Sequence, residues 1–148
     1  MSQSEASTYG FELDVAQAGQ KYDLRPDVVQ SFAAEAAIEP GQPVQRGTDP
    51  EKQVLVADDD AFLGIALFTH TLTQPLDGDG AQYDIGEAVS VLTEGAAYVI
   101  SSVDDVVAGE TAYVTDAGEY TNVEGSNLAI GTFITSGGED DLVVVELS

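Results

Sequence analysis

The stretch "GEAVSVLTEGAAYVISSVDDVVAGETAYVTDAG", residues 86–118, contains the pattern that decides the fold. Short apolar runs alternate with polar residues, and a glycine or an acidic turn follows each run. This alternation is typical of β-strands with one buried face, because successive side chains point to opposite faces of a strand. We expect residues 87–93 and 96–102 to form a hairpin whose turn is Glu94-Gly95, and Ala117-Gly118 to form the turn of a second hairpin. The stretch predicts a β-rich fold.

The same signals extend outward from this stretch in both directions. Further strands are expected at residues 28–32, 43–47, 52–57, 62–74, 128–136 and 142–148, with a bulge at Gly64. Short strands with turn signals about every ten residues are typical of a small β-sandwich or barrel built from hairpins. We therefore expect an all-β protein with a single β-domain over residues 26–148. The weakly patterned residues 1–25 are expected to form an extended N-terminal arm.

The charge of the chain is its most unusual property. It has 27 acidic and four basic residues, a formal net charge of −23, and no lysine or arginine after Lys52. Self-repulsion of this size opposes a compact state, but at ~1 M salt the Debye length falls to ~3 Å and most of the repulsion is screened. Disorder is disfavoured because 43% of the residues are hydrophobic and these are patterned. The composition indicates a halophilic source.

Composition also excludes several classes of protein. Nucleic-acid binding is disfavoured, because phosphate contacts require clustered lysine and arginine. The chain has no cysteine, so disulfides and thiolate metal sites are excluded. The N-terminal residues have neither the basic nor the apolar region of a secretory signal, and no apolar run approaches the ~18 residues of a membrane span. We therefore expect no membrane partner.

No catalytic constellation is visible in the sequence. His70 is the only histidine, and it could act as a general base beside a carboxylate. It lies among threonines in an expected strand, which favours a surface or subunit contact instead. Neither a GxSxG nucleophile motif nor a phosphate-binding glycine loop is present. The sequence predicts a protein that is not an enzyme and needs no cofactor.

Two acidic stretches raise the possibility of a calcium site. They are residues 57–61 and "DGDGAQYD", residues 77–84, and hard cations prefer clustered carboxylates. The second stretch lacks the glutamate that closes an EF-hand loop. In so acidic a chain, solvated turns are the favoured interpretation, and no metal site is predicted. A halophilic carbohydrate- or calcium-binding β-domain is the alternative that stays open.

The order of four stretches resembles that of the structural cement (head decoration) proteins of tailed phages. They are "AGQKYDLRPDVVQSFAAEAAIEPGQPVQRGTD", "FLGIALFTHTLTQ", "YDIGEAVSVLTEGAAYVISSVDDVVAGETAYVTDAG" and "IGTFITSGGEDDLVVVELS". The resemblance covers most of residues 18–148. It implies a β-rich protein on the outer surface of the virion capsid, assembled in the host cytoplasm. It also implies a homotrimer that spans joints between major capsid protein subunits.

This resemblance suggests which residues contact the capsid. The least acidic part of the chain is expected to face the major capsid protein, and an extended arm could add backbone hydrogen bonds to capsid strands. The expected capsid contacts are Lys21, Tyr22, Arg25, Arg46 and Lys52, and His70 is the expected subunit contact. In the alternative interpretation, the bases are ordinary surface residues. Arg25 with Asp27, and Lys52 with Glu51, would then be exposed pairs that contribute under ~1 kcal/mol each.

Overall fold

The protein is built from strands joined by turns, as the alternating sequence predicts. The computed structural model describes residues 18–22, 27–58, 60–68, 82–103 and 105–147. Its strands are β2 (Val28–Ala34), β3 (Pro43–Arg46), β4 (Gln53–Val56), β5 (Gly64–Ala66), β6 (Ala88–Ile100), β7 (Thr111–Val114), β8 (Tyr120–Thr121), β9 (Leu128–Phe133) and β10 (Leu142–Leu147). The all-β prediction is confirmed. Within these ranges, no helix has the length and apolar character needed to cross a membrane.

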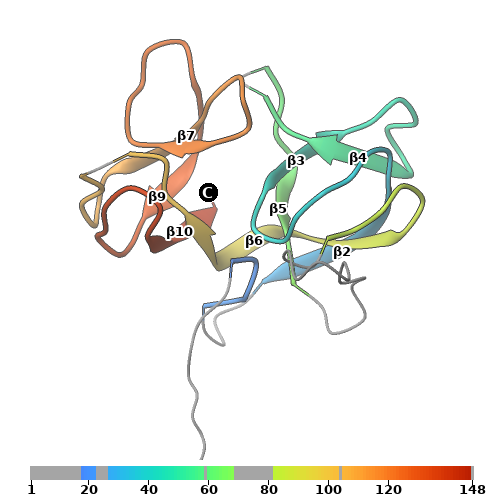
Figure 1. Ribbon diagram of the computed structural model, residues 1–148, viewed down its shortest axis with the longest axis horizontal. Helices are drawn as coiled ribbons and strands as arrows, with labels where there is room; N and C mark the ends of the chain where they lie inside the picture. Colours follow the sequence, from blue (N-terminus) through green and yellow to red (C-terminus); the bar gives the residue numbers. More distant parts are fainter. Residues whose placement is uncertain (1–17, 23–26, 59, 69–81, 104, 148) are drawn as a thin grey trace, which may run out of the picture.

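The N-terminal half forms a small closed barrel. Its strands follow the order β2-β4-β3-β5-β6, and β6 pairs again with β2, which closes the ring. The β2–β4 pair is parallel and the other pairs are antiparallel. Figure 1 shows this barrel on the right, with β2 along its lower side. A buried cluster that includes Ile38, Val44, Val54 and Tyr83 fills it.

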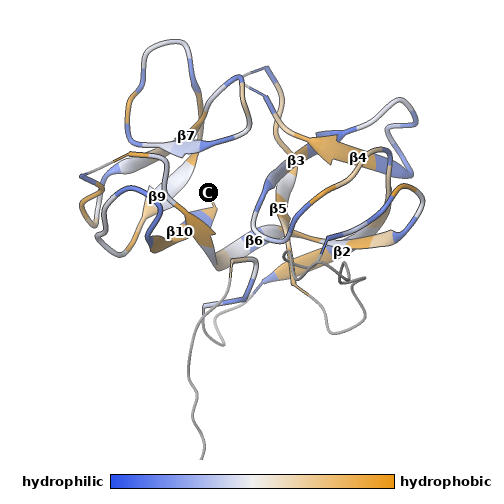
Figure 2. Cartoon of the chain, viewed as in Figure 1, coloured by the Kyte–Doolittle hydropathy of each residue, from blue (hydrophilic) through white to orange (hydrophobic). Residues whose placement is uncertain are grey.

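The C-terminal half repeats the arrangement on the other part of β6. Here the order is β6-β10-β9-β7-β8, and a bridge between Ser101 and Tyr120 brings β8 back to the end of β6. In Figure 1 these strands lie on the left, and β6 runs across the middle into both halves. Phe133 and Val145 belong to the second buried cluster, which also takes in Leu92 from β6. The apolar residues in Figure 2 follow the strands, while the turns are mostly hydrophilic.

The predicted hairpin at Glu94-Gly95 is wrong, because β6 continues straight through these residues. Val28 of β2 lies opposite Glu94 and Val29 lies opposite Leu92, so the ladder skips one residue of β6 and forms a bulge there. Gly95 has a φ of 120°, and a Cβ on it would lie 2.7 Å from the Cβ of Asp27. Gly95 therefore lies inside β6, where the absence of a side chain lets Asp27 pack close to the strand. It does not form a turn.

Two further predictions concern the strand at residues 28–32 and the hairpin at Ala117-Gly118, and two concern Gly64 and the strand that contains it. β2 contains the expected strand at 28–32, and β7 and β8 form the expected hairpin around Ala117-Gly118. The expected bulge at Gly64 is wrong, since the pairing of β5 with its neighbours shows no register shift. Gly64 is needed because a Cβ there would collide with the carbonyl oxygen of Leu92. Of the expected strand 62–74, β5 covers residues 64–66, and residues 69–74 lie outside the described part.

Candidate interaction surface

The first described residues are held along β6. The N–H of Gly19 donates a hydrogen bond to the carbonyl of Tyr98 (2.8 Å), and the N–H of Tyr22 donates to the carbonyl of Ala96 (3.0 Å). Lys21 forms an antiparallel bridge with Ala97 between these bonds. Because β2 pairs with residues 88–94 of β6, residues 19–22 continue the line of β2 along the same strand.

The N-terminal part of β2 has an open edge. Ala33 donates its N–H to the carbonyl of Lys52 (2.7 Å), on the side of β4, and the pairing with β4 involves only Ala33 and Ala34. Backbone groups alternate sides along a strand, so the N–H and C=O groups of Val29 and Ser31 point to the same side as those of Ala33. In the described part of the chain no strand lies beside them there. Residues 28–31 are exposed, and the valines at 28 and 29 are 38% and 42% exposed.

The described basic residues lie at the two ends of β2. At its start, Lys21 Nζ lies 3.2 Å from a carboxylate oxygen of Asp27. At its far end, the guanidinium of Arg46 lies 5.6 Å from the ring centre of Phe32 in β2, and it donates to the carbonyl of Pro50 (2.6 Å). Lys52 is exposed, and its backbone carbonyl accepts the hydrogen bond from the N–H of Ala33 in β2. These bases are far apart in sequence but lie along one strand.

An aromatic side chain completes this region. Tyr22 is 38% exposed and packs edge-on against Tyr98, with ring centres 5.7 Å apart. We use the name β2 surface for the exposed residues around this strand. It comprises Lys21, Tyr22, Val28, Val29, Ser31, Arg46 and Lys52. The β2 surface combines apolar groups, an open strand edge and the described positive charges.

Glu35 fixes the turn that carries two of these bases. Its carboxylate accepts hydrogen bonds from the N–H and the hydroxyl of Thr48, both at 2.7 Å. These hydrogen bonds, from the hydroxyl first and the backbone second, lower the pKa of Glu35 below its ordinary value because they stabilise the charged form. The ionised Glu35 therefore anchors the β3–β4 turn beside the end of β2.

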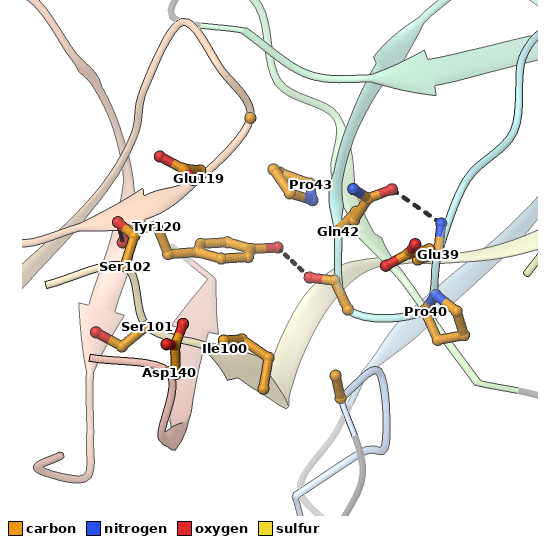
Figure 3. Close-up of a pocket in the computed structure, with 13 residues that line it drawn as sticks. Glu39, Pro40, Gln42, Pro43, Ile100, Ser101, Ser102, Glu119, Tyr120 and Asp140 are labelled. Atoms are coloured by element: carbon orange, nitrogen blue, oxygen red, sulfur yellow. Dashed lines mark hydrogen bonds between the residues drawn. The ribbon is translucent and has the colours of Figure 1, made fainter. Parts of the chain in front are cut away.

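A pocket of about 310 Å³ lies where the two halves meet. Figure 3 shows Tyr120 projecting from the C-terminal half toward the turn that precedes Gln42. Its hydroxyl donates to the carbonyl of Gly41 (2.7 Å), and burial raises the pKa of Tyr120 well above its ordinary value. The lining includes Pro40, Pro43, Ile100, Ser101, Glu119 and Asp140. Sequence reasoning missed this pocket, since Tyr120 and Gly41 are 79 residues apart.

The structure shows no group of side chains arranged for metal chemistry in its described ranges. No three or more histidine, cysteine or acidic residues come together there in a way that could hold an ion. The two stretches considered for calcium fall partly outside these ranges, since Asp59 and residues 77–81 are not described. The carboxylates of the pocket, Glu39, Glu119 and Asp140, are exposed.

Comparison with known proteins identifies the family of the chain. The family model described as "Structural cement protein (E217 gp24/Pam3 gp6)" matches residues 6–148. The chain belongs to this family of structural cement proteins. No curated protein sequence matches it. Its role is thus structural, in stabilising a phage capsid, which confirms the function expected from the sequence.

Two solved structures share the fold. A chain in "The capsid of Myoviridae Phage XM1" has a TM-score of 0.66 and 20% identity, over 96% of this chain and 97% of that one. The N base of the head fibre protein gp8.5 of bacteriophage phi29 has a TM-score of 0.50 and 15% identity, over 83% of this chain and 95% of that one. At these identities the likeness concerns the fold alone.

Several contacts expected from the sequence can now be placed. Lys21, Tyr22, Arg46 and Lys52 all lie on the β2 surface, whereas Arg25 and His70 lie outside the described residues. Asp27, considered as a partner of Arg25, pairs with Lys21. Lys52 forms no ion pair with Glu51 or any other residue within the described ranges. The exposed valines of β2 were not singled out from the sequence, because their exposure depends on the short pairing of β2 with β4, which involves only Ala33 and Ala34.

Proposed function

We propose that this cement protein binds the outer surface of the major capsid protein lattice through its β2 surface. One observation carries the proposal: the described bases of a chain with net charge −23 gather around one strand that also exposes apolar side chains. A face that approaches another protein closely must limit like-charge repulsion and offer apolar area, as the cores of protein interfaces do. Arg25, close in sequence to Lys21, would belong to the same face.

The proposal extends to assembly and location. The protein would act as a homotrimer on the virion, after assembly in the host cytoplasm, with His70 at a subunit contact. Many copies that each bury a modest area would strengthen the shell through multivalency. Its acidity opposes contact with nucleic acid or with anionic membrane surfaces, so neither is a proposed partner. The proposed role is non-enzymatic and needs no cofactor, in keeping with the structural character of the family.

Neutralising the bases at the end of β2 tests the proposed contact. We expect the double variant Arg46→Gln/Lys52→Gln to bind capsids of the same virus that lack this protein at least about tenfold more weakly. This corresponds to ~1.4 kcal/mol, close to the lower end of the range for charge pairs at interfaces. Co-sedimentation of the protein with such capsids over a range of concentrations gives the affinity.

A matched control separates local contact from overall charge. The variant Val107→Glu/Ser126→Glu changes the net charge by the same amount at exposed positions of the C-terminal half, and its affinity should stay within about twofold. Because Arg46 also contacts Phe32 and Pro50, Lys52→Gln is tested alone, and each variant is melted to verify folding. If the control variant and the β2 variants bind capsids with the same affinity, the β2 surface is not the contact with the capsid. If wild-type protein does not bind capsids, the proposed function fails.

We also propose that the protein works in concentrated salt, as expected for a virus of a halophilic host. Its acids have few bases to neutralise them, so their repulsion must be screened by ions. The melting temperature should rise continuously between about 0.15 M and about 3 M KCl, and most steeply below ~1 M, where the Debye length changes most. A melting temperature that is independent of KCl concentration would contradict this proposal.

A further inference from the structure

The two halves of the protein are two copies of one structural unit. Each half contains two turns in which the third residue has a positive φ and the side-chain oxygen of the fourth residue accepts the N–H of the first. A strand begins directly after each of these turns. The turns are residues 39–42 and 84–87 in the N-terminal half, and residues 107–110 and 138–141 in the C-terminal half. The order of turns and strands is therefore repeated along the chain.

The strand pairing shows which residues of the two halves correspond. Val44 in β3 lies opposite Gly64, and Ala112 in β7 lies opposite Gly131. A Cβ on either glycine would collide with a carbonyl oxygen of the neighbouring strand, so both positions need glycine for the same reason. β4 pairs with β3 in the same register as β8 pairs with β7. By this register the corresponding pairs include Glu39 and Val107, Pro40 and Ala108, Gly41 and Gly109, and Ala57 and Val123.

The surface formed by the turn 39–42 and Ala57 is covered by the C-terminal half. Ala57 is 2% exposed and belongs to the buried cluster of that half. Gly118, between β7 and β8, lies against it, since a Cβ on Gly118 would be 3.0 Å from the carbonyl oxygen of Ala57. Tyr120 reaches the turn, where its hydroxyl donates to the carbonyl of Gly41 (2.7 Å; Figure 3). The unit thus has a surface that accepts another unit of the same kind.

The corresponding surface of the C-terminal half is exposed. Val123 is 56% exposed, although its counterpart is buried. Ala108 and Gly109 are exposed as well, and in the described part of the chain no atom beyond the adjacent residues lies within 4 Å of the position of a Cβ on Gly109. Asn122 donates a hydrogen bond from Nδ2 to Oε1 of Glu110 (2.9 Å), which places Val123 beside the turn. We use the name outer surface for Ala108, Gly109 and Val123.

We propose that the outer surface packs against a second copy of this chain. The same surface of the N-terminal half is covered by a barrel of this protein, so its shape and its small apolar groups fit such a barrel. The contact joins two different surfaces, and contacts of this type close into a ring when the rotation between copies allows it, as a homotrimer requires. The inference rests on the self-association in the proposed function, and it names a contact for it in addition to His70.

Light scattering after size exclusion tests the contact on the full chain, in concentrated KCl, without capsids and over a range of protein concentrations. Val123→Glu should raise the dissociation constant of the oligomer at least about tenfold, because the contact would bury a charge among apolar groups. Val107→Glu is the matched control. It adds the same charge in the same half, and Glu39, the counterpart of Val107, stays exposed where the two halves meet. Its dissociation constant should stay within about twofold of the wild-type value, and thermal melting verifies that both variants fold.

A second measurement reports burial of the outer surface directly. The chain has no cysteine, so Val123→Cys introduces a single thiol. Its reaction with a maleimide should be at least about tenfold slower at protein concentrations where the oligomer forms than at concentrations where the protein is monomeric. Val107→Cys, as the control, should react at the same rate at both concentrations. A substitution that only disturbs folding would not produce this dependence on concentration.

Three results would overturn the proposal. They are a wild-type protein that is monomeric at every concentration, a Val123→Glu variant that associates as strongly as Val107→Glu, and a Val123→Cys thiol that reacts equally fast at both concentrations. The second and third results exclude only this contact and leave the proposed homotrimer in place. None of the three depends on capsids, so the proposed binding to the major capsid protein can hold or fail separately.

Discussion

Replacing Phe133 with alanine is expected to lower the free energy of unfolding by about 3–5 kcal/mol, the usual cost of removing a large buried aromatic side chain. Phe133 is fully buried in the core of the C-terminal half, where it faces Val145 across the β9–β10 pair. Its backbone N–H and C=O are bonded to Glu110 and Gly109, so the surrounding turn is fixed and cannot easily collapse into the cavity. The loss should therefore be near the upper end of the range.

Denaturant unfolding at a fixed, high salt concentration measures this effect. The control is Val107→Ala, an exposed residue of the same half, which should change the stability by no more than about 0.5 kcal/mol. If Phe133→Ala lowers the free energy of unfolding by less than about 0.5 kcal/mol, as a surface substitution would, the buried cluster of the C-terminal half is not packed as described. An unfolding curve with two steps would show that the two halves unfold separately.

Tyr120→Phe is expected to lower the stability by about 1–3 kcal/mol, because it removes the donor that satisfies the buried carbonyl of Gly41. The shape of the ring is kept, so the loss reports the hydrogen bond between the two halves and not a cavity. Tyr113→Phe, at a half-buried position on β7, is the control and should cost less. Equal losses for the two tyrosines would mean that the bond to Gly41 contributes no special stability.

The same residue gives the protein a dependence on alkaline pH. Burial raises the pKa of Tyr120 above the ordinary value near 10, so the folded state holds its proton more tightly than the unfolded state. Its contribution is fully present below about pH 10 and is lost as the pH rises above that value. Wild-type stability should thus fall more steeply than that of Tyr120→Phe between about pH 9 and pH 11. Parallel pH profiles would contradict this assignment.

The local parts of the fold could be predicted because they depend on neighbouring residues. The hairpin at Ala117-Gly118 is one example, since its turn residues and its two strands are adjacent in sequence. The continuous path of β6 could not be predicted in this way. Glu94-Gly95 has the composition of a turn, but its conformation is set by β2 and by Asp27, more than sixty residues earlier. Non-local pairing overrides local preference at that point.

The candidate site was only partly accessible to sequence reasoning for the same reason. Composition shows that the bases are confined to the first third of the chain, which brought Lys21, Arg46 and Lys52 into consideration. It does not show that they lie at the two ends of one strand, because this depends on the closure of the first barrel by β2, β4 and β6. The open edge of β2 follows from that closure as well, since β4 reaches only its last residues.

The passage of β6 through both barrels has a mechanical consequence. A protein that stabilises a phage capsid must itself withstand mechanical load. Here the two halves share one uninterrupted strand of 13 residues, so tension between them is carried along covalent backbone bonds. A force along β6 would shear the pairs of strands on either side of it. In this geometry many hydrogen bonds must break at the same time, and the strands cannot separate one bond at a time. Such a chain should resist stretching better than two domains joined by a flexible linker.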